Sequence, residues 1–390
     1  MSLVPIPWIA LKIFGAEPSP ILISLITGLT IFAAAFLLTW ASEAAERDVT
    51  GSLIIALIAL IAVLPEYAVD STLAWSAGKD ISFAPYAIAN MTGANRLLIG
   101  IGWASLVFLS ALKTKGHKTS VQIHPIQRLD CGILAIATLY AFTIPLKGFL
   151  AWFDGLLLGG LFIFYLVKIL RFPRVELEII GPAKAISEIE PKKCRVAVWV
   201  GLMAYAALAI AISAEPFAHS LITTGKALQI DEFILVQWLA PLASETPEFV
   251  IALLFAWRLK ATKGLGVLVS SKINQWTLLI GTLPLVFWLS EKWHGSAGLT
   301  YFPLDARQSQ EIFLTAAQSL FAVVLLANLS LSLKEAFALA ILFCTQLVMP
   351  WSEARNVFTY IYLGLAVIVF LATPRTSLHS WRAVLRALKH

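Results

Sequence analysis

The stretch A-V-L-P-E-Y-A-V-D (Ala62 to Asp70) sets a proline and a glutamate in the middle of an apolar run, and A-S-E-T-P-E-F-V-I-A (Ala243 to Ala252) does so again. A carboxylate inside a bilayer costs about 3 kcal/mol on insertion scales, and proline removes a backbone donor from a helix. Such a costly arrangement, used twice, indicates that Glu66 and Glu248 are functional acids within membrane-spanning helices.

The composition supports a polytopic membrane protein. Hydrophobic residues make up 59% of the 390 residues and charged residues 13%, and the mean hydropathy is +0.83, values that a globular domain does not reach. The basic residues behind the net charge of +6 lie in loops between apolar runs, so we expect no nucleic-acid partner. Cys131, Cys194 and Cys344 have neither metal-binding nor redox spacing.

Eleven apolar runs are long enough to span a bilayer as helices, and the chain is therefore predicted to be all-α. The runs are 20–46, 51–77, 82–112, 128–146, 148–171, 195–218, 230–258, 263–290, 309–328, 331–350 and 355–373. Residues 1–19 are apolar, but they contain Pro5 and Pro7 and lack a basic start, so we expect an interfacial segment and not a cleaved signal peptide.

Loop charge sets the expected topology. Lysine and arginine cluster after the third, fifth and seventh runs and in the tail 375–390, while Gly78-Lys79-Asp80 after the second run is nearly neutral. By the positive-inside rule the amino terminus lies outside and the carboxyl terminus in the cytoplasm. The cell membrane is the default location. The basic tail is expected to lie on anionic lipid.

The position of the two Pro-Glu pairs predicts inverted repeats. Glu66 lies in the second run and Glu248 in the seventh, and a shift by five spans reverses orientation across the membrane. The expected layout is two inverted five-helix repeats, about ten or eleven transmembrane helices in all. Its parts are an interfacial segment at 1–19, repeats at 20–172 and 195–350, a cytoplasmic linker at 173–194, an extra helix at 351–374 and a basic tail at 375–390.

The run after each Pro-Glu helix is unusually polar. It reads I-A-N-M-T-G-A-N-R-L-L-I-G (Ile88 to Gly100) in the first half and S-S-K-I-N-Q-W-T-L-L-I-G (Ser270 to Gly281) in the second. Small, hydroxyl and amide side chains replace the leucine and valine of a lipid-facing helix, so these segments should line a polar interior or a tight helix contact. The shared L-L-I-G ending supports the repeat.

A Pro-Glu helix followed by an asparagine-containing polar helix, once in each half, resembles the alpha repeats of the sodium/calcium exchanger and cation/proton antiporter superfamily. The motifs cover 50–112 and 230–290. The resemblance implies that Glu66 and Glu248 supply metal-ligating carboxylates and that Asn90, Asn95 and Asn274 belong to the cation site. Three features depart from the family pattern. The Gly-Thr-Ser that usually precedes Leu-Pro-Glu is missing, Ala94 stands in place of the serine of the family's Gly-Ser-Asn, and an eleventh span exceeds the usual ten.

Further polar residues near these motifs are candidates for the same site. Asp70, Glu245, Thr92 and Ser271 are candidate ion-binding residues, and Arg96 and Lys272 are candidate modulators of its charge. A fixed cation beside the acids favours a monovalent ion or one Ca²⁺ over several cations and offers a route to proton coupling. The alternative for each acid is a helix-bridging carboxylate. For Arg96 and Lys272 it is a structural salt bridge or snorkelling.

The sequence therefore predicts a secondary active cation antiporter with a mid-membrane carboxylate site that works by alternating access. Exchange of Na⁺ or Ca²⁺ against H⁺, and of Na⁺ against Ca²⁺, all remain open. A cation channel is the first alternative. A membrane-embedded enzyme is less favoured, because the chain has no H-E-x-x-H or G-x-S-x-G motif. The expected partners are the lipid bilayer and small inorganic cations, with no cofactor and no obligate protein partner.

Overall fold

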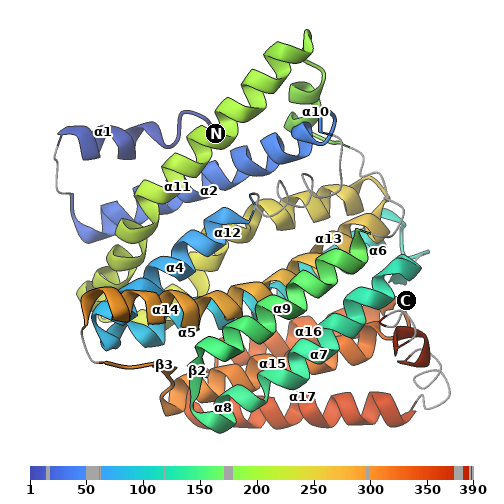
Figure 1. Cartoon of the computed structure of the whole chain (residues 1–390). Helices are drawn as coiled ribbons and strands as arrows, with labels where there is room; N and C mark the ends of the chain where they lie inside the picture. The colour runs from blue at the N-terminus through green and yellow to red at the C-terminus, as the bar shows by residue number, and fades with distance from the viewer. Residues whose placement is uncertain are drawn as a thin grey trace. The chain divides into compact units, whose positions relative to one another are not determined.

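The structure is a computed structural model that describes residues 1–14, 18–49, 61, 63–117, 119–170, 179–295, 298–372, 381–385 and 388. Figure 1 shows that this part of the chain is built almost entirely from helices. Nine helices within it are long and apolar enough to cross a membrane. The predicted all-α membrane fold is confirmed.

The helices follow the expected order in both halves. The first half contains α2 (Pro20–Ala45), α4 (Leu64–Lys79), α5 (Ala84–Leu97), a π-helical turn (Leu98–Trp103), α6 (Ala104–Lys113), α7 (Arg128–Ala141), α8 (Thr143–Lys147) and α9 (Trp152–Ile169). The second half contains α11 (Lys192–Leu228), α12 (Glu232–Trp257), α13 (Ala261–Asn274), a second π-helical turn (Gln275–Leu279), α14 (Ile280–His294), α15 (Ala306–Leu326), α16 (Leu333–Leu347) and α17 (Ser352–Ala372). Short helices α1 (Ile6–Phe14) and α10 (Pro182–Ser187) precede each half.

Two boundaries differ from the sequence prediction. The run 195–218 underestimates α11, which continues to Leu228 because its last turns carry polar residues outside the apolar window, and Gln229 ends it in a left-handed conformation. The run 331–350 contains the shorter helix α16, preceded by a strand. The expected run 51–77 is described from residue 63 onward, and of its earlier residues only residue 61 is described.

The described helices form two compact units. Unit 1 comprises Met1–Leu73 and Leu170–Pro247, and unit 2 comprises Ala74–Ile169 and Glu248–His390. Each unit therefore takes equivalent stretches from both halves of the chain. Unit 1 holds the first span and the start of the Pro-Glu helix of each half, and unit 2 holds everything that follows.

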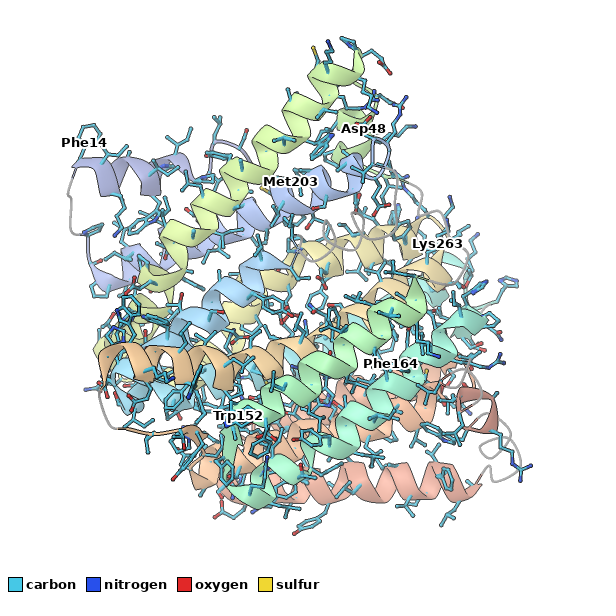
Figure 2. All side chains as sticks on the ribbon, viewed as in Figure 1. Phe14, Asp48, Trp152, Phe164, Met203 and Lys263 are labelled. Atoms are coloured by element: carbon cyan, nitrogen blue, oxygen red, sulfur yellow. The ribbon has the colours of Figure 1, made fainter. Side chains whose placement is uncertain are left out.

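In unit 1, α2 and α11 lie side by side (Figure 1). Small side chains at their contact, among them Ala34, Ala41 and Ala206, allow the two backbones to approach closely. Met203, labelled in Figure 2, belongs to the same cluster. Just beyond the end of α2, Asp48 accepts two hydrogen bonds from Arg195 at 2.7 and 2.9 Å. These bonds lower the pKa of the Asp48 carboxyl.

Four short strands reveal the repeat in unit 2. Strand β1 (Ser120–Gln122) pairs with β4 (Ser330–Ser332), and β2 (Phe149–Ala151) pairs with β3 (Tyr301–Pro303), both antiparallel. The number of residues from Ser120, where β1 starts, to Tyr301, where β3 starts, equals the number from Phe149, where β2 starts, to Ser330, where β4 starts. We call this shared spacing the repeat offset. The loop after the third span of one half therefore pairs with the loop after the fourth span of the other, as two inverted repeats require.

The glycine of each L-L-I-G ending lies at a crossing between the halves within unit 2. A Cβ at Gly100 would overlap Phe343 on α16, the fifth span of the second half. A Cβ at Gly281 would lie 3.1 Å from the carbonyl oxygen of Gly155 on α9, the fifth span of the first half. The two glycines therefore allow close packing at both crossings. A Cβ at Gly100 would require Phe343 to shift, and little room is left for a Cβ at Gly281.

Part of the carboxyl-terminal tail packs against the helices of unit 2. Val384 is 1% exposed, and a Cβ at Gly132 of α7 would come within 3.0 Å of Val384 and Leu388. Val384 and Leu388 of the tail therefore pack on α7, whereas Leu385 is 56% exposed.

Candidate ion-binding site

Three of the four predicted acids lie in unit 1, and all three are buried. Glu66 occupies the first turn of α4 and is 4% exposed, while Asp70 is 0% and Glu245 is 2% exposed. Pro65 precedes Glu66 in that first turn, a position where its missing amide costs little. Because ionisable side chains at such depth are expensive, their burial favours a functional role.

The second Pro-Glu helix is continuous although it contains two prolines. Helix α12 runs from Glu232 to Trp257 through Pro241 and Pro247. Neighbouring hydrogen bonds can keep a proline-containing helix intact. Pro247 still lacks the amide that would donate to the carbonyl of Ala243. A carbonyl oxygen without its usual helical donor therefore remains near Glu248.

Glu248 lies in unit 2 and is held by the polar helix of its own half. The hydroxyl of Ser271 on α13 donates a hydrogen bond to Glu248 Oε2. The next residue, Phe249, packs against the π-helical turn of the first half, because a Cβ at Gly102 would lie 3.0 Å from its ring. π turns occur frequently at functional sites, and here each half has one directly after its asparagine motif.

The asparagine helix of the first half is buried throughout its polar stretch. Asn90, Thr92 and Asn95 are each 0% exposed. The Thr92 hydroxyl donates to the carbonyl of Ile88 at 2.7 Å, and the Asn95 amide donates to the carbonyl of Met91 at 2.8 Å. Both bonds fix donor groups along the helix, which leaves the Asn95 side-chain oxygen as an acceptor.

Lys272 fills that acceptor position within unit 2. Its ammonium donates to Asn95 Oδ1 at 2.6 Å and to the Asn95 carbonyl at 3.3 Å, and it lies 4.3 Å from the centre of the Trp276 ring. The side chain is 0% exposed. Two residues further on, Asn274 is 7% exposed. The Lys272 ammonium therefore binds an amide oxygen and a carbonyl oxygen, the ligand types that alkali and alkaline-earth ions use.

Arg96 points into a different network of unit 2. Its guanidinium forms an ion pair with Glu311 on α15 at 2.5 Å and donates to Gln346 on α16 at 3.1 Å. Arg355 on α17 also approaches Glu311, at 3.7 Å. The charge of Arg96 is thus met by a buried carboxylate that the sequence reasoning missed. Glu311 follows Asp130 by the repeat offset, and this spacing is the sequence signal that could have identified Glu311 as a buried acid.

No group of three His, Cys, Asp or Glu side chains poised to hold a metal ion is found among the described residues. Transported cations bind more weakly than resident metals and use carbonyl, hydroxyl and amide oxygens alongside carboxylates. The residues that unit 2 brings together, Glu248 with Ser271 and Asn95 with Lys272, are of these types.

Comparison with known proteins identifies the family. The model of the sodium/calcium exchanger protein family matches residues 19–171 and 198–352. The structure titled "Crystal Structure of H+/Ca2+ Exchanger CAX" is similar at 41% identity and a TM-score of 0.91, over 100% of this chain and 96% of that chain. No curated protein sequence matches the chain.

Two more distant structures share the fold. YfkE is 15% identical with a TM-score of 0.60, over 92% of this chain and 96% of its own. The sodium-calcium exchanger NCX_Mj is 15% identical with a TM-score of 0.55, over 84% of this chain and 98% of its own. With the family match covering most of both halves, the chain belongs to the sodium/calcium exchanger family and is a multi-pass membrane cation antiporter.

Proposed function

We propose that this antiporter exchanges Ca²⁺ for H⁺, with Glu66 and Glu248 as carboxylate ligands of the transported ion. The proposal is supported by the 41% identity to an H⁺/Ca²⁺ exchanger over the whole chain. Protonation neutralises a carboxylate and removes its attraction for Ca²⁺, so the same acids can serve both ions in turn.

The contact between Lys272 and Asn95 is the observation that favours H⁺ over Na⁺ as the counter-ion. The ammonium binds Asn95 Oδ1 and the Asn95 carbonyl oxygen, two oxygens of the type that coordinates Na⁺. A fixed charge there disfavours the binding of several alkali cations, because like charges at this distance repel strongly in a medium of low dielectric constant. A proton needs no coordination shell, so occupation of these two oxygens does not prevent a proton from binding to a carboxylate.

The remaining candidates receive supporting roles. Asn90, Thr92, Asn274 and Ser271 supply amide or hydroxyl groups, and Asp70 and Glu245 are proton carriers or further ligands. Lys272 modulates the charge of the site, whereas the pairing of Arg96 with Glu311 supports a structural role for Arg96.

We place the protein in the cell membrane, with the amino terminus outside and the tail in the cytoplasm, on the grounds of loop charge. Its partners in this proposal are the bilayer and small cations. The relatives named above are exchangers, and the proposal includes no enzymatic activity.

The test uses the purified full chain in liposomes that contain a pH indicator. Radiocalcium uptake is followed while a pH gradient or a Na⁺ gradient is imposed separately. We expect uptake driven by the pH gradient, with protons moving in the opposite direction, and no uptake driven by Na⁺ alone. Uptake that follows the Na⁺ gradient and leaves the luminal pH unchanged would contradict proton coupling.

A further inference from the structure

Asp130 is a buried acid that the proposed ion site does not use. It is the third residue of α7, at the start of the fourth span, and the loop charge predicts this end of the span to face the cytoplasm. Asp130 is 1% exposed. Its Oδ2 accepts a hydrogen bond from Ser270 on α13 at 3.5 Å. The hydroxyl of Tyr165 on α9 and the side chain of Gln127 also lie within reach of the carboxyl. All of these residues belong to unit 2.

The repeat provides a comparison for this position. Asp130 and Glu311 are separated by the repeat offset that also relates β1 to β3 and β2 to β4. Glu311 is neutralised by Arg96 and Arg355. At the position equivalent to Arg96 the second half has Thr277, whose hydroxyl donates to the carbonyl of Ile273 at 2.6 Å. The base that neutralises the acid in one copy is therefore a threonine in the other.

Among the described residues no lysine, arginine or histidine forms an ion pair with Asp130. In the described part of the chain, the charged and titratable groups on the elements packed around it form no hydrogen bond or ion pair with its carboxyl, apart from Tyr165. Arg128 is on its own helix, Lys168 on α9 lies over the ring of Phe164 (labelled in Figure 2), and Lys272 on α13 binds Asn95. Tyr165 and Cys131 are neutral, and Arg382 in the tail is exposed.

This environment suits a carboxyl that gains and loses a proton. Burial disfavours the charged form of a carboxyl that no described base pairs with, whereas the hydroxyls of Ser270 and Tyr165 can donate to a carboxylate or accept from a carboxylic acid. Moreover, Asp130 Oδ1 has no hydrogen bond of standard geometry among the described residues. It is an oxygen on which a proton can reside without breaking an existing bond.

The position also connects Asp130 to the proposed cation ligand. Ser270 contacts Asp130, and the next residue, Ser271, donates to Glu248. Consecutive residues of an α-helix point about 100° apart, so the two carboxyls lie on different faces of α13 and form separate sites. Because Ser270 and Ser271 are consecutive residues of α13, a shift of this part of the helix would alter the hydrogen bonds of both carboxyls.

We propose that Asp130 is a second proton-binding site of the antiporter, separate from Glu66 and Glu248 and linked to Glu248 through Ser270 and Ser271. The proposal rests on proton-coupled exchange as the function. The bound proton leaves the buried carboxyl neutral, and its release creates a charge that α13 must accommodate.

The first measurement is the infrared difference spectrum of the purified protein between acidic and alkaline pH, which reports the C=O stretch of carboxylic acids. Asp130→Asn is expected to remove one such band. Ser270→Ala and Tyr165→Phe are expected to shift the band without abolishing it, because each removes one hydrogen-bond partner of the carboxyl. An unchanged band pattern in a folded Asp130→Asn variant overturns the proposal, whether or not the protein transports Ca²⁺.

The second measurement is the pH profile of exchange in liposomes. Asp130→Asn is expected to move the pH of half-maximal exchange by about one unit towards acid, because loss of the negative charge weakens proton binding at the remaining carboxyls. Arg174→Gln separates a proton site from an ion pair, since Arg174 and Arg355 are related by the repeat offset in the sequence. If Arg174→Gln creates a carboxylic-acid band that the parent lacks, Asp130 is ion-paired and the proposal is wrong.

The two measurements also separate this proposal from the proposed function. Should the parent protein fail to couple Ca²⁺ to H⁺, the function is wrong, but the infrared band still reports whether Asp130 binds a proton. If the parent couples both ions and Asp130→Asn changes neither the band nor the profile, only the inference about Asp130 fails.

Discussion

The ammonium of Lys272 lies 2.6 Å from the side-chain oxygen of Asn95, which comes from the other half of the chain. The lysine is 0% exposed and also donates to the Asn95 carbonyl at 3.3 Å. The Lys272 ammonium thus binds two oxygens in the way that a metal cation would, but it is covalently part of the protein and is not transported. The contact joins the polar helices of the two repeats within one unit and motivates the first prediction.

Replacing Lys272 by glutamine should strengthen cation binding and move the pH of half-maximal exchange towards alkaline values. The reason is that loss of the ammonium makes the site more negative, so its carboxyls hold cations and protons more tightly. Calcium affinity and the pH profile are measured in proteoliposomes. Lys272→Arg, which keeps the charge, and Lys263→Gln, on the same helix, are the controls. A parental profile and affinity in Lys272→Gln would show that the lysine is structural.

Replacing either repeated acid by its amide should abolish exchange while leaving membrane insertion intact. Glu66→Gln and Glu248→Gln each remove one anionic oxygen ligand but keep the size of the side chain. Radiocalcium uptake should fall to the level of empty liposomes. Glu188→Gln, in the linker, with an exposed side chain at 61%, is the matched control and should transport normally. Normal transport by both buried variants would refute the assignment of the ion ligands.

Arg96 should be needed for stability. Arg96→Met leaves Glu311 with Arg355 at 3.7 Å as its remaining base, and breaking a buried ion pair costs roughly 3–5 kcal/mol. The free energy of unfolding in detergent is the measured quantity, with Arg258→Met at an exposed position as control. A double-mutant cycle with Glu311→Gln should give a clear coupling energy. Additive effects of the two substitutions would argue against the pair.

The inverted topology predicts opposite labelling on the two sides of the third span. Single cysteines are introduced at Lys79, Lys115 and Lys260 in a background from which Cys131, Cys194 and Cys344 have been removed. The cysteine that replaces Lys79 should react with an impermeant thiol reagent from outside. The cysteines that replace Lys115 and Lys260 should react from inside, as the positive-inside rule requires. Reaction of Lys79 and Lys115 from the same side would rule out the topology.

Asp48 should stabilise the protein only above acidic pH. Because Arg195 lowers the pKa of Asp48 below its ordinary value of 3.8, the folded state favours the carboxylate. The stabilisation is present above that value and is lost as the pH falls through the lower pKa of the folded state. Asp48→Asn should therefore lower the melting temperature at neutral pH, and the difference from the parent should shrink below about pH 4. A difference that is independent of pH would indicate that charge is not involved.

The sequence alone determined the membrane class, the order of the spans, the two Pro-Glu pairs and the inverted relation of the halves. These features depend on local composition and on residue spacing, since a bilayer requires about 20 apolar residues per helix and an odd shift of spans reverses orientation. The same reasoning located Lys272 and Arg96 but left their roles undecided between ion site and salt bridge.

Only the tertiary structure decided which buried group each charge meets. Arg96 reaches Glu311 and Lys272 reaches Asn95, in each case across from one half of the chain to the other. No local pattern encodes these pairs, because they depend on how helices from both repeats cross and on which side chains fill the space between them. The strand pairs and the contrast between Asp130 and Glu311 likewise became visible only when the two halves were folded together, since a pairing between distant loops has no signal in either loop by itself.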